Sequence, residues 1–184
     1  MFHIKDDKRS QKSAELLVKA FDDCLKEHDF YELTVKELCI VSTVGRATFY
    51  RLFDRIEDIV SYKFSMLTDG FVKDFQPKSS KEAAVLFFKM WMENIDFLLL
   101  LIKLGKQGLF YEAHMKYLDS LKTEFLHLGR KVQLDEYTAS VLSSVLLGML
   151  IAWAKKEKRE GAEEIVEKMK TVLLQTGNIF DEKK

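Results

Sequence analysis

Proline occurs once in this chain of 184 residues, at Pro77, and glycine occurs eight times. Both residues interrupt regular structure, so a chain with so few of them can form long helices. It lacks the frequent turns that a sandwich or barrel of many short strands requires. Leucine and lysine, which both favour helices, occur 25 and 23 times. The sequence therefore predicts an all-α fold.

The N-terminal third of the chain carries the pattern of three helices. Apolar side chains recur on one helical face over residues 8–28. After an interruption, Thr34 and Glu37 have the spacing of a capping box at the start of a short helix. A break of about three residues, 42–44, separates it from a second short helix. That helix opens at Gly45 and reads RATFYRLF.

Further helices are expected along the rest of the chain. Asp54 and Glu57 repeat the capping spacing before a longer helix over residues 56–75, and Ser79 and Glu82 repeat it after the proline. Beyond the proline, the expected helices span residues 80–93, 95–104, 109–128, 135–158 and 162–178.

Two short helices joined by a tight break are typical of a helix-turn-helix, in which the second helix reads DNA. Four apolar residues would anchor this second helix, and five residues would face outward. The anchors are Val44, Phe49, Leu52 and Phe53, and the outward residues are Arg46, Ala47, Thr48, Tyr50 and Arg51. With Arg55, three of the six arginines lie within ten residues, and the guanidinium group suits both phosphate and guanine. We therefore divide the chain into a DNA-binding domain at 1–60 and a larger helical-bundle domain at 61–184.

The charge balance of the first 60 residues argues against a purely electrostatic DNA binder. This segment carries 10 basic and 12 acidic side chains. The acids concentrate before the second short helix, at Asp22, Asp23, Glu27, Asp29 and Glu32. Short packed helices also occur in many all-α proteins that do not bind DNA, so the spacing alone leaves that alternative open.

The run TVKELCIVSTVGRATFYRLFDRIEDIV resembles the N-terminal signature of the TetR/AcrR family of bacterial transcriptional regulators. The residues that carry the resemblance are Thr34, Val35, Leu38, Val44, Thr48, Phe49, Tyr50 and Phe53. It covers about residues 9–60, and the C-terminal domains of the family diverge widely. The resemblance implies a homodimer that binds double-stranded operator DNA and holds an inducer pocket in each C-terminal domain.

The resemblance also implies roles for single residues. Thr34 would contact a phosphate at the start of its helix. Arg46 and Thr48 would face base edges, whereas Tyr50 and Arg51 would face the DNA backbone.

Three positions depart from the pattern of the family. Gly45 stands where a serine is common, which leaves only a backbone N–H at that helix end. Thr43 replaces the usual turn glycine, so the turn must avoid positive φ or accept strain. Ile56 replaces a phosphate-binding lysine, for which Arg55 would substitute. The expected DNA-binding residues are thus Thr34, Gly45, Arg46, Ala47, Thr48, Tyr50, Arg51 and Arg55.

Small residues recur every four positions along the helix expected at 135–158, and such a stripe lets two helix backbones approach closely. The final helix adds an apolar seam. The expected dimer interface consists of Ser140, Ser144, Gly148, Ala152, Ile165, Met169, Val172 and Leu173. A packing face within one chain is the alternative, because small residues serve any close helix contact.

Aromatic and methionine side chains at helical spacing are candidates for a ligand pocket. They are Phe88, Trp91, Met92, Phe110, Tyr111, His114, Tyr117 and Trp153. The alternative is a plain hydrophobic core, which uses the same residue types. A pocket with this lining would take a small apolar or aromatic ligand rather than a charged sugar or phosphate.

The sequence offers little that would support catalysis or a metal site. Glu124 and His127 form only one half of a di-iron pair, and neither a glycine-rich phosphate loop nor a nucleophile elbow occurs. Cys24 and Cys39 match no zinc spacing and favour reduced thiols in the cytoplasm. The uncharged stretch 137–154 reaches the length of a membrane span, but hydroxyl side chains crowd its first half. We expect no enzyme activity, no cofactor, no metal and no membrane partner.

These patterns predict a TetR-type, sequence-specific transcriptional regulator that binds a palindromic operator as a homodimer. We expect repression, with release by a small apolar or aromatic ligand. One alternative is a helical interaction protein that acts through a protein partner, which the acidic balance and the altered turn favour. The other is a membrane-associated bundle that uses residues 137–154.

Overall fold

The computed structural model describes residues 1–74, 79–113, 115, 135–156 and 160–179. Throughout these residues the regular structure is helical, and the one β-type contact is an isolated bridge between Phe2 and Phe53. The predicted all-α class is confirmed. The chain forms two compact units, which we call unit 1 (Met1–Gly70) and unit 2 (Phe71–Lys184).

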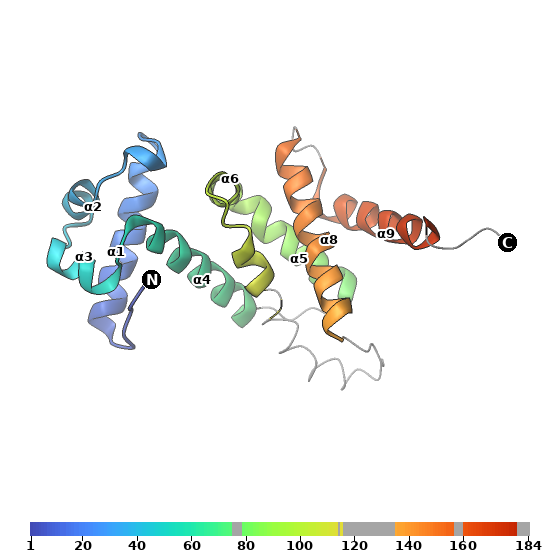
Figure 1. Cartoon of the computed structure of the whole chain (residues 1–184), viewed down its shortest axis with the longest axis horizontal. Helices are drawn as coiled ribbons and strands as arrows, with labels where there is room; N and C mark the ends of the chain where they lie inside the picture. Colours follow the sequence, from blue (N-terminus) through green and yellow to red (C-terminus); the bar gives the residue numbers. More distant parts are fainter. Residues whose placement is uncertain (75–78, 114, 116–134, 157–159, 180–184) are drawn as a thin grey trace. The chain divides into compact units, whose positions relative to one another are not determined.

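Unit 1 is built around α1 (Lys8–Cys24), which begins where the Asp7 carboxylate accepts a hydrogen bond from the backbone N–H of Ser10. The 3₁₀ helix η1 (Phe30–Glu32) follows, and then α2 (Val35–Ser42) and α3 (Arg46–Leu52). Figure 1 shows α2 and α3 on one side of α1, and both pack against it. The helix α4 (Ile56–Asp74) begins in unit 1 and ends just beyond it.

Unit 2 contains α5 (Ser80–Glu93), α6 (Ile95–Lys103), α8 (Glu136–Lys155) and α9 (Ala162–Ile179). The helix α8 packs against α5, α6 and α9. Ion pairs tie α5 to α9, where Lys81 contacts Glu167 and Lys89 Nζ lies 2.7 Å from Glu163 Oε1. Most of the helix predicted at 109–128 lies outside the described residues.

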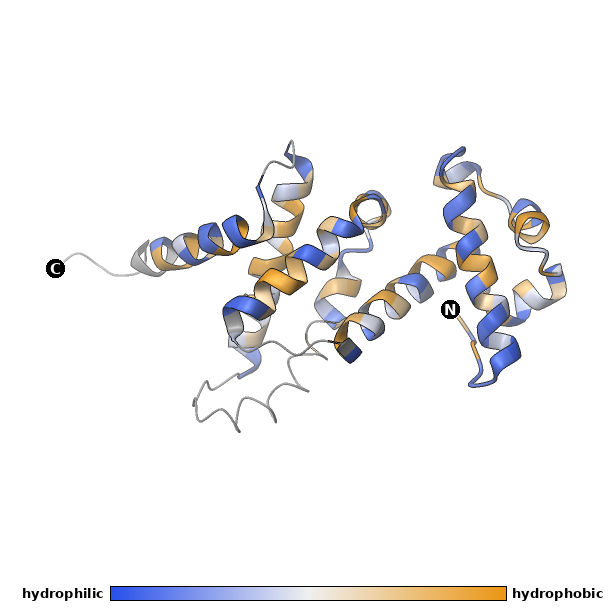
Figure 2. Cartoon of the chain, turned by 180° about the vertical axis from the view of Figure 1, so that it is seen from behind, coloured by the Kyte–Doolittle hydropathy of each residue, from blue (hydrophilic) through white to orange (hydrophobic). Residues whose placement is uncertain are grey.

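The helix α8 is the most apolar long element among the described residues (Figure 2). By length and composition it could cross a membrane, with a mean hydropathy of 1.6 over its best window. Only 28% of that window is buried within the structure. A core helix of a soluble protein passes the same test of length and composition, so this feature is compatible with a soluble protein.

Helix capping differs from the prediction at two places. At α2, Thr34 Oγ1 accepts the backbone N–H of Glu37 at 3.2 Å as expected, but the Glu37 carboxylate lies 3.2 Å from His28 Nε2. At α4, the cap is Asp58 rather than the predicted pair of Asp54 and Glu57, because Asp58 Oδ2 accepts the backbone N–H groups of residues 54 and 55.

A complete capping box forms at η1, where the sequence predicts only an interruption. The Asp29 side chain accepts a backbone N–H from η1, and the Glu32 carboxylate accepts the backbone N–H of Asp29 at 3.0 Å. The helix α1 ends at Cys24, four residues before the predicted end, and a turn over residues 25–28 leads to η1.

Candidate nucleic-acid interface

The turn between α2 and α3 is held by two buried residues. Ser42 Oγ accepts the backbone N–H of Val44 at 3.2 Å, and both residues are buried. Between them, Thr43 is exposed and adopts a left-handed backbone, with φ 58° and ψ 17°. Of the two outcomes that the sequence allows at Thr43, the structure has the strained one.

Buried side chains on one side of α3 fix how this helix lies. Phe49, Leu52 and Phe53 have at most 1% of their surface exposed. The ring of Phe49 packs against that of Phe53 at a centroid distance of 5.9 Å. These are the anchors that the sequence predicts, so the opposite side of α3 must face outward.

The outward side of α3 consists of four predicted DNA-binding residues. Arg46, Ala47 and Arg51 are exposed, and Tyr50 is exposed over 54% of its surface. Thr48 is only partly exposed, because it lies at the edge of the buried side. An α-helix that presents polar and cationic groups on one side fits the major groove of DNA.

The other three predicted DNA-binding residues lie outside α3. Gly45 precedes α3 and is exposed, with no side chain to cap the helix. Thr34 is exposed at the start of α2, and its oxygen already accepts a backbone hydrogen bond. Arg55 follows α3 and lies 3.9 Å from Asp58, with 68% of its side chain exposed.

Both arginines of α3 are exposed on the outward side of this helix. In the part of the chain that the structure describes, no carboxylate pairs with Arg46 or Arg51. Burial raises the pKa of the Cys39 thiol, and the nearby Arg46 guanidinium opposes this rise. Two free guanidinium groups on one helix face are the strongest candidates here for phosphate and guanine contacts.

The acidic residues of unit 1 are largely engaged elsewhere. Asp22 pairs with Lys63 of α4, and Asp23 Oδ1 lies 2.6 Å from Lys26 Nζ. The acids of η1 serve its capping box. The excess of acid over base in this unit therefore does not neutralise the arginines of α3.

A group of residues at the C-terminal end of α3 has no signal in the sequence. The amino group of Met1 lies 2.8 Å from both Asp54 Oδ2 and Asp58 Oδ2, and His3 Nε2 lies 3.0 Å from Asp54 Oδ1. Hydrogen bonds from Met1 and His3 lower the pKa of Asp54, and the bond to Asp54 raises the pKa of the Met1 amino group. The ring of Phe2 packs edge-on against that of Tyr62.

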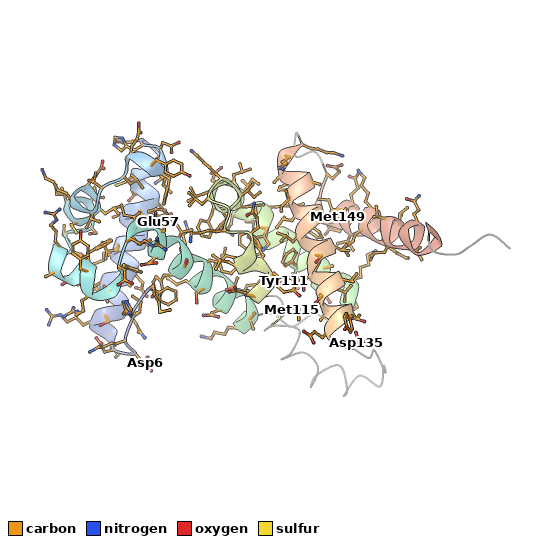
Figure 3. The ribbon with its side chains drawn as sticks, in the orientation of Figure 1. Asp6, Glu57, Tyr111, Met115, Asp135 and Met149 are labelled. Carbon is orange, nitrogen blue, oxygen red and sulfur yellow. The ribbon has the colours of Figure 1, made fainter. Side chains whose placement is uncertain are left out.

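The predicted dimer residues lie on two helices, α8 and α9, and differ in exposure. Ser144, Gly148 and Ala152 are exposed on α8, together with Tyr137 (83% exposed) and Val141 (56% exposed). On α9, Val172 is exposed, Met169 and Leu173 are half-buried, and Ile165 is buried in the core of unit 2. Ser140 is half-buried, and its hydroxyl lies 2.7 Å from that of Tyr111. Figure 3 labels Tyr111 beside α8.

A groove of about 480 Å³ runs between α8 and α9. Its floor is apolar and includes Met149, Trp153 and Ile165, and its rim carries Lys168 and three glutamates. The Trp153 indole donates a hydrogen bond to the backbone oxygen of Glu160 at 3.1 Å. Ala152 and Val172 of the predicted interface also line this groove.

The predicted pocket residues do not form one described cavity. Phe88, Trp91 and Phe110 are buried, and the rings of Trp91 and Phe110 pack at a centroid distance of 4.3 Å. Met92 is half-buried and Tyr111 is exposed, while Trp153 lines the groove of α8 and α9 instead. His114 and Tyr117 lie outside the described residues.

Comparison with solved structures finds the same fold in other proteins, among them the following two. The crystal structure of Lin0861 from Listeria innocua aligns over 95% of this chain and 96% of its own, with a TM-score of 0.75 and 16% identity. The dihydroxyacetone kinase operon activator DhaS aligns over 92% of this chain and 98% of its own, with a TM-score of 0.62 and 16% identity. No family profile and no curated protein matches the sequence. The fold is thus one that an operon activator also has.

Proposed function

We propose that this chain is a TetR-type transcriptional regulator that binds DNA sequence-specifically as a homodimer. The observation that carries the proposal is the outward face of α3. Arg46 and Arg51 are exposed there, and within the residues that the structure describes no carboxylate pairs with either. Phe49 and Leu52 fix the helix from behind. In a helix-turn-helix dimer, two such helices enter successive major grooves, about one helical turn apart. The proposed activity is binding rather than catalysis, without a cofactor, in the cytoplasm.

The exposed face of α8 supports the dimer. Tyr137, Val141, Ser144, Gly148 and Ala152 repeat at helical spacing, and all are exposed in a single chain. A second copy of this face would bury the apolar surface, and the small residues would let the helices approach closely. The same contact would explain why so apolar a helix is mostly exposed.

The sign of regulation and the ligand are the finer parts of the proposal. We expect repression, relieved when a small apolar or aromatic ligand binds unit 2 and favours a dimer whose recognition helices no longer match the operator. The name of DhaS describes an operon activator, so a reporter gene under the selected operator must decide the sign. A fall in expression upon production of this protein would support repression.

Selection from a random duplex pool tests the DNA-binding proposal. We expect one palindrome to be enriched, with affinity falling steeply as salt rises. Arg46→Ala should weaken the free energy of binding to the selected duplex by about 1–3 kcal/mol and relax the sequence preference at one base pair of each half-site. Arg51→Ala should lower the affinity for all duplexes alike. It should also reduce the slope of log affinity against log salt concentration by the amount that about one phosphate contact contributes.

The matched control removes a charge from the other unit. Lys170 is exposed on α9, so Lys170→Ala should leave both the affinity and the preferred sequence unchanged. Equal affinity of wild type and Arg46→Ala would refute the role proposed for Arg46. No enrichment from a folded dimer at low salt would refute DNA binding itself. The remaining candidate would then be an interaction protein, which the exposed Ile40 and Val41 on α2 favour.

A further inference from the structure

Thr43 ends α2 in a backbone conformation that side-chain-bearing residues rarely adopt. Among the residues that the structure describes, it is the one non-glycine with positive φ. Its branched side chain makes this left-handed conformation strained, and glycine would remove the strain. The side chain at position 43 therefore lowers the stability of the turn.

The chain uses glycine for the same backbone task elsewhere. Gly105 follows α6 with φ 64°, and its N–H donates to the carbonyl of Ile102 at 3.1 Å. In the same way, the N–H of Thr43 donates to the carbonyl of Ile40 at 3.3 Å. Both residues follow the end of a helix in the left-handed conformation. Glycine adopts it without strain, so the presence of a threonine at position 43 calls for a reason other than the backbone.

The surrounding residues impose this geometry on Thr43. The buried Ser42 hydroxyl accepts the N–H of Val44, and the buried Val44 side chain leads into α3. Strain of this kind persists where neighbours over-determine the backbone, and it concentrates at functional sites. Since the backbone of the turn is held in place, the Cα–Cβ bond of Thr43 keeps one direction.

The hydroxyl of Thr43 is available for a contact outside the chain. Thr43 is exposed, and the described part of the chain offers its hydroxyl no hydrogen-bond partner. The next exposed residues are Gly45 and Arg46, at the start of the proposed reading helix. Threonine hydroxyls commonly bind the DNA backbone, and contacts to phosphates position a protein on the duplex.

We propose that the Thr43 hydroxyl donates a hydrogen bond to a phosphate of the operator, so that the strained turn is part of the DNA-binding surface. This inference rests on the proposed DNA-binding function. The contact is to phosphate because Thr43 has a short side chain and lies in the turn, before the helix that would enter the groove. It adds a positioning contact to those of α3.

Three variants of Thr43 separate the hydroxyl from the strain. Thr43→Gly removes both, and we expect Tm to rise by about 2–4 °C while the affinity for the selected duplex falls about tenfold. Thr43→Val keeps the branched shape without the hydroxyl, so the affinity should fall by a similar factor with no rise in Tm. Thr43→Ser keeps the hydroxyl, and its affinity should stay within about threefold of wild type.

The salt dependence distinguishes this contact from that of a cation. No charge is removed in any of the three variants, so the slope of affinity against salt should stay unchanged, unlike that of Arg51→Ala. Binding by Thr43→Gly and Thr43→Val as tight as wild type, beside weak binding by Arg46→Ala, would refute the contact and leave the proposed function standing. Failure of the wild type to bind any duplex would refute both.

Discussion

Replacing Gly45 by serine and, separately, by aspartate tests whether the start of α3 faces DNA. Gly45 has φ −63° and ψ 146°, an extended conformation that any residue adopts. A Cβ added there would meet nothing within 4 Å, and no side chain caps α3 in the wild type. Both substitutions therefore fit the folded chain without strain.

The two substitutions should stabilise the protein alike. A serine or aspartate at this position can accept a free N–H of the first turn of α3, which is worth a few tenths of a kcal/mol relative to glycine. Loss of the glycine also restricts the unfolded chain and adds about 0.4–1 kcal/mol. The sum is about 1 kcal/mol, which corresponds to a rise in Tm of about 2–4 °C for a chain of this size.

The two substitutions should differ in DNA binding, because only aspartate adds a negative charge. Serine should keep or improve the affinity, whereas aspartate should oppose one phosphate contact. One such contact changes the affinity about threefold between 50 and 200 mM salt. The gap between the two variants should therefore be about three times wider at 50 mM than at 200 mM.

Thermal unfolding and fluorescence anisotropy with the selected duplex measure both effects on the same samples. The serine variant is the matched control, because it shares the new cap and lacks the charge. If the two variants bind equally at both salt concentrations, Gly45 does not face the duplex, and the orientation proposed for α3 is wrong.

Three further predictions concern the parts that support the proposed interface. Asp58→Ala should lower the free energy of unfolding of unit 1 by about 2–3 kcal/mol in urea unfolding, since a buried carboxylate that accepts two backbone N–H groups is lost. A change in this free energy below about 0.5 kcal/mol would contradict the role of Asp58. Asp54→Asn should lower Tm at pH 7, because it removes an ion pair with the Met1 amino group. The difference in Tm from wild type should shrink as pH rises above 8.0, since this amino group, whose pKa is raised, then loses its proton. A constant difference up to pH 10.5 would argue against this ion pair. Gly148→Gln has free space in the single chain and should favour the α8 helix, yet light scattering should report monomers, because the larger side chain stands in the proposed interface. The control Gly70→Gln should leave the dimer intact. A Gly148→Gln dimer of unchanged affinity would exclude the α8 face as the interface.

Much of the helical order follows from local sequence signals. The helix predicted at residues 80–93 is α5 (Ser80–Glu93), and Ser79 caps it as predicted. The break at 42–44 and the anchors of α3 are likewise local, because they depend on spacing within a few residues. A chain with one proline leaves few other places where helices can end.

Contacts between distant residues could not be predicted in the same way. Phe2 pairs with Phe53, and His3 contacts Asp54, across about fifty residues that no local pattern links. The choice of Asp58 over Glu57 as a cap depends on which carboxylate turns toward the backbone of residues 54 and 55. Neither periodicity nor a capping motif distinguishes two adjacent acids.

The strain at Thr43 lies between these two cases. The sequence identifies the position and leaves two outcomes, a turn without positive φ or a strained turn. The deciding contacts are the buried hydroxyl of Ser42 and the buried side chain of Val44, which fix the backbone on both sides. A local prediction cannot weigh that packing against the cost of the left-handed conformation.

The carboxylate of Asp58 has a mechanical consequence for the joint between α3 and α4. Its Oδ2 atom holds the backbone of residues 54 and 55, and the rings of Phe53 and Tyr62 pack across the joint at a centroid distance of 5.7 Å. A connection that is held by hydrogen bonds and by packed aromatic rings is rigid and does not act as a hinge. A turn of the first part of α4 about its own axis would therefore carry α3 with it.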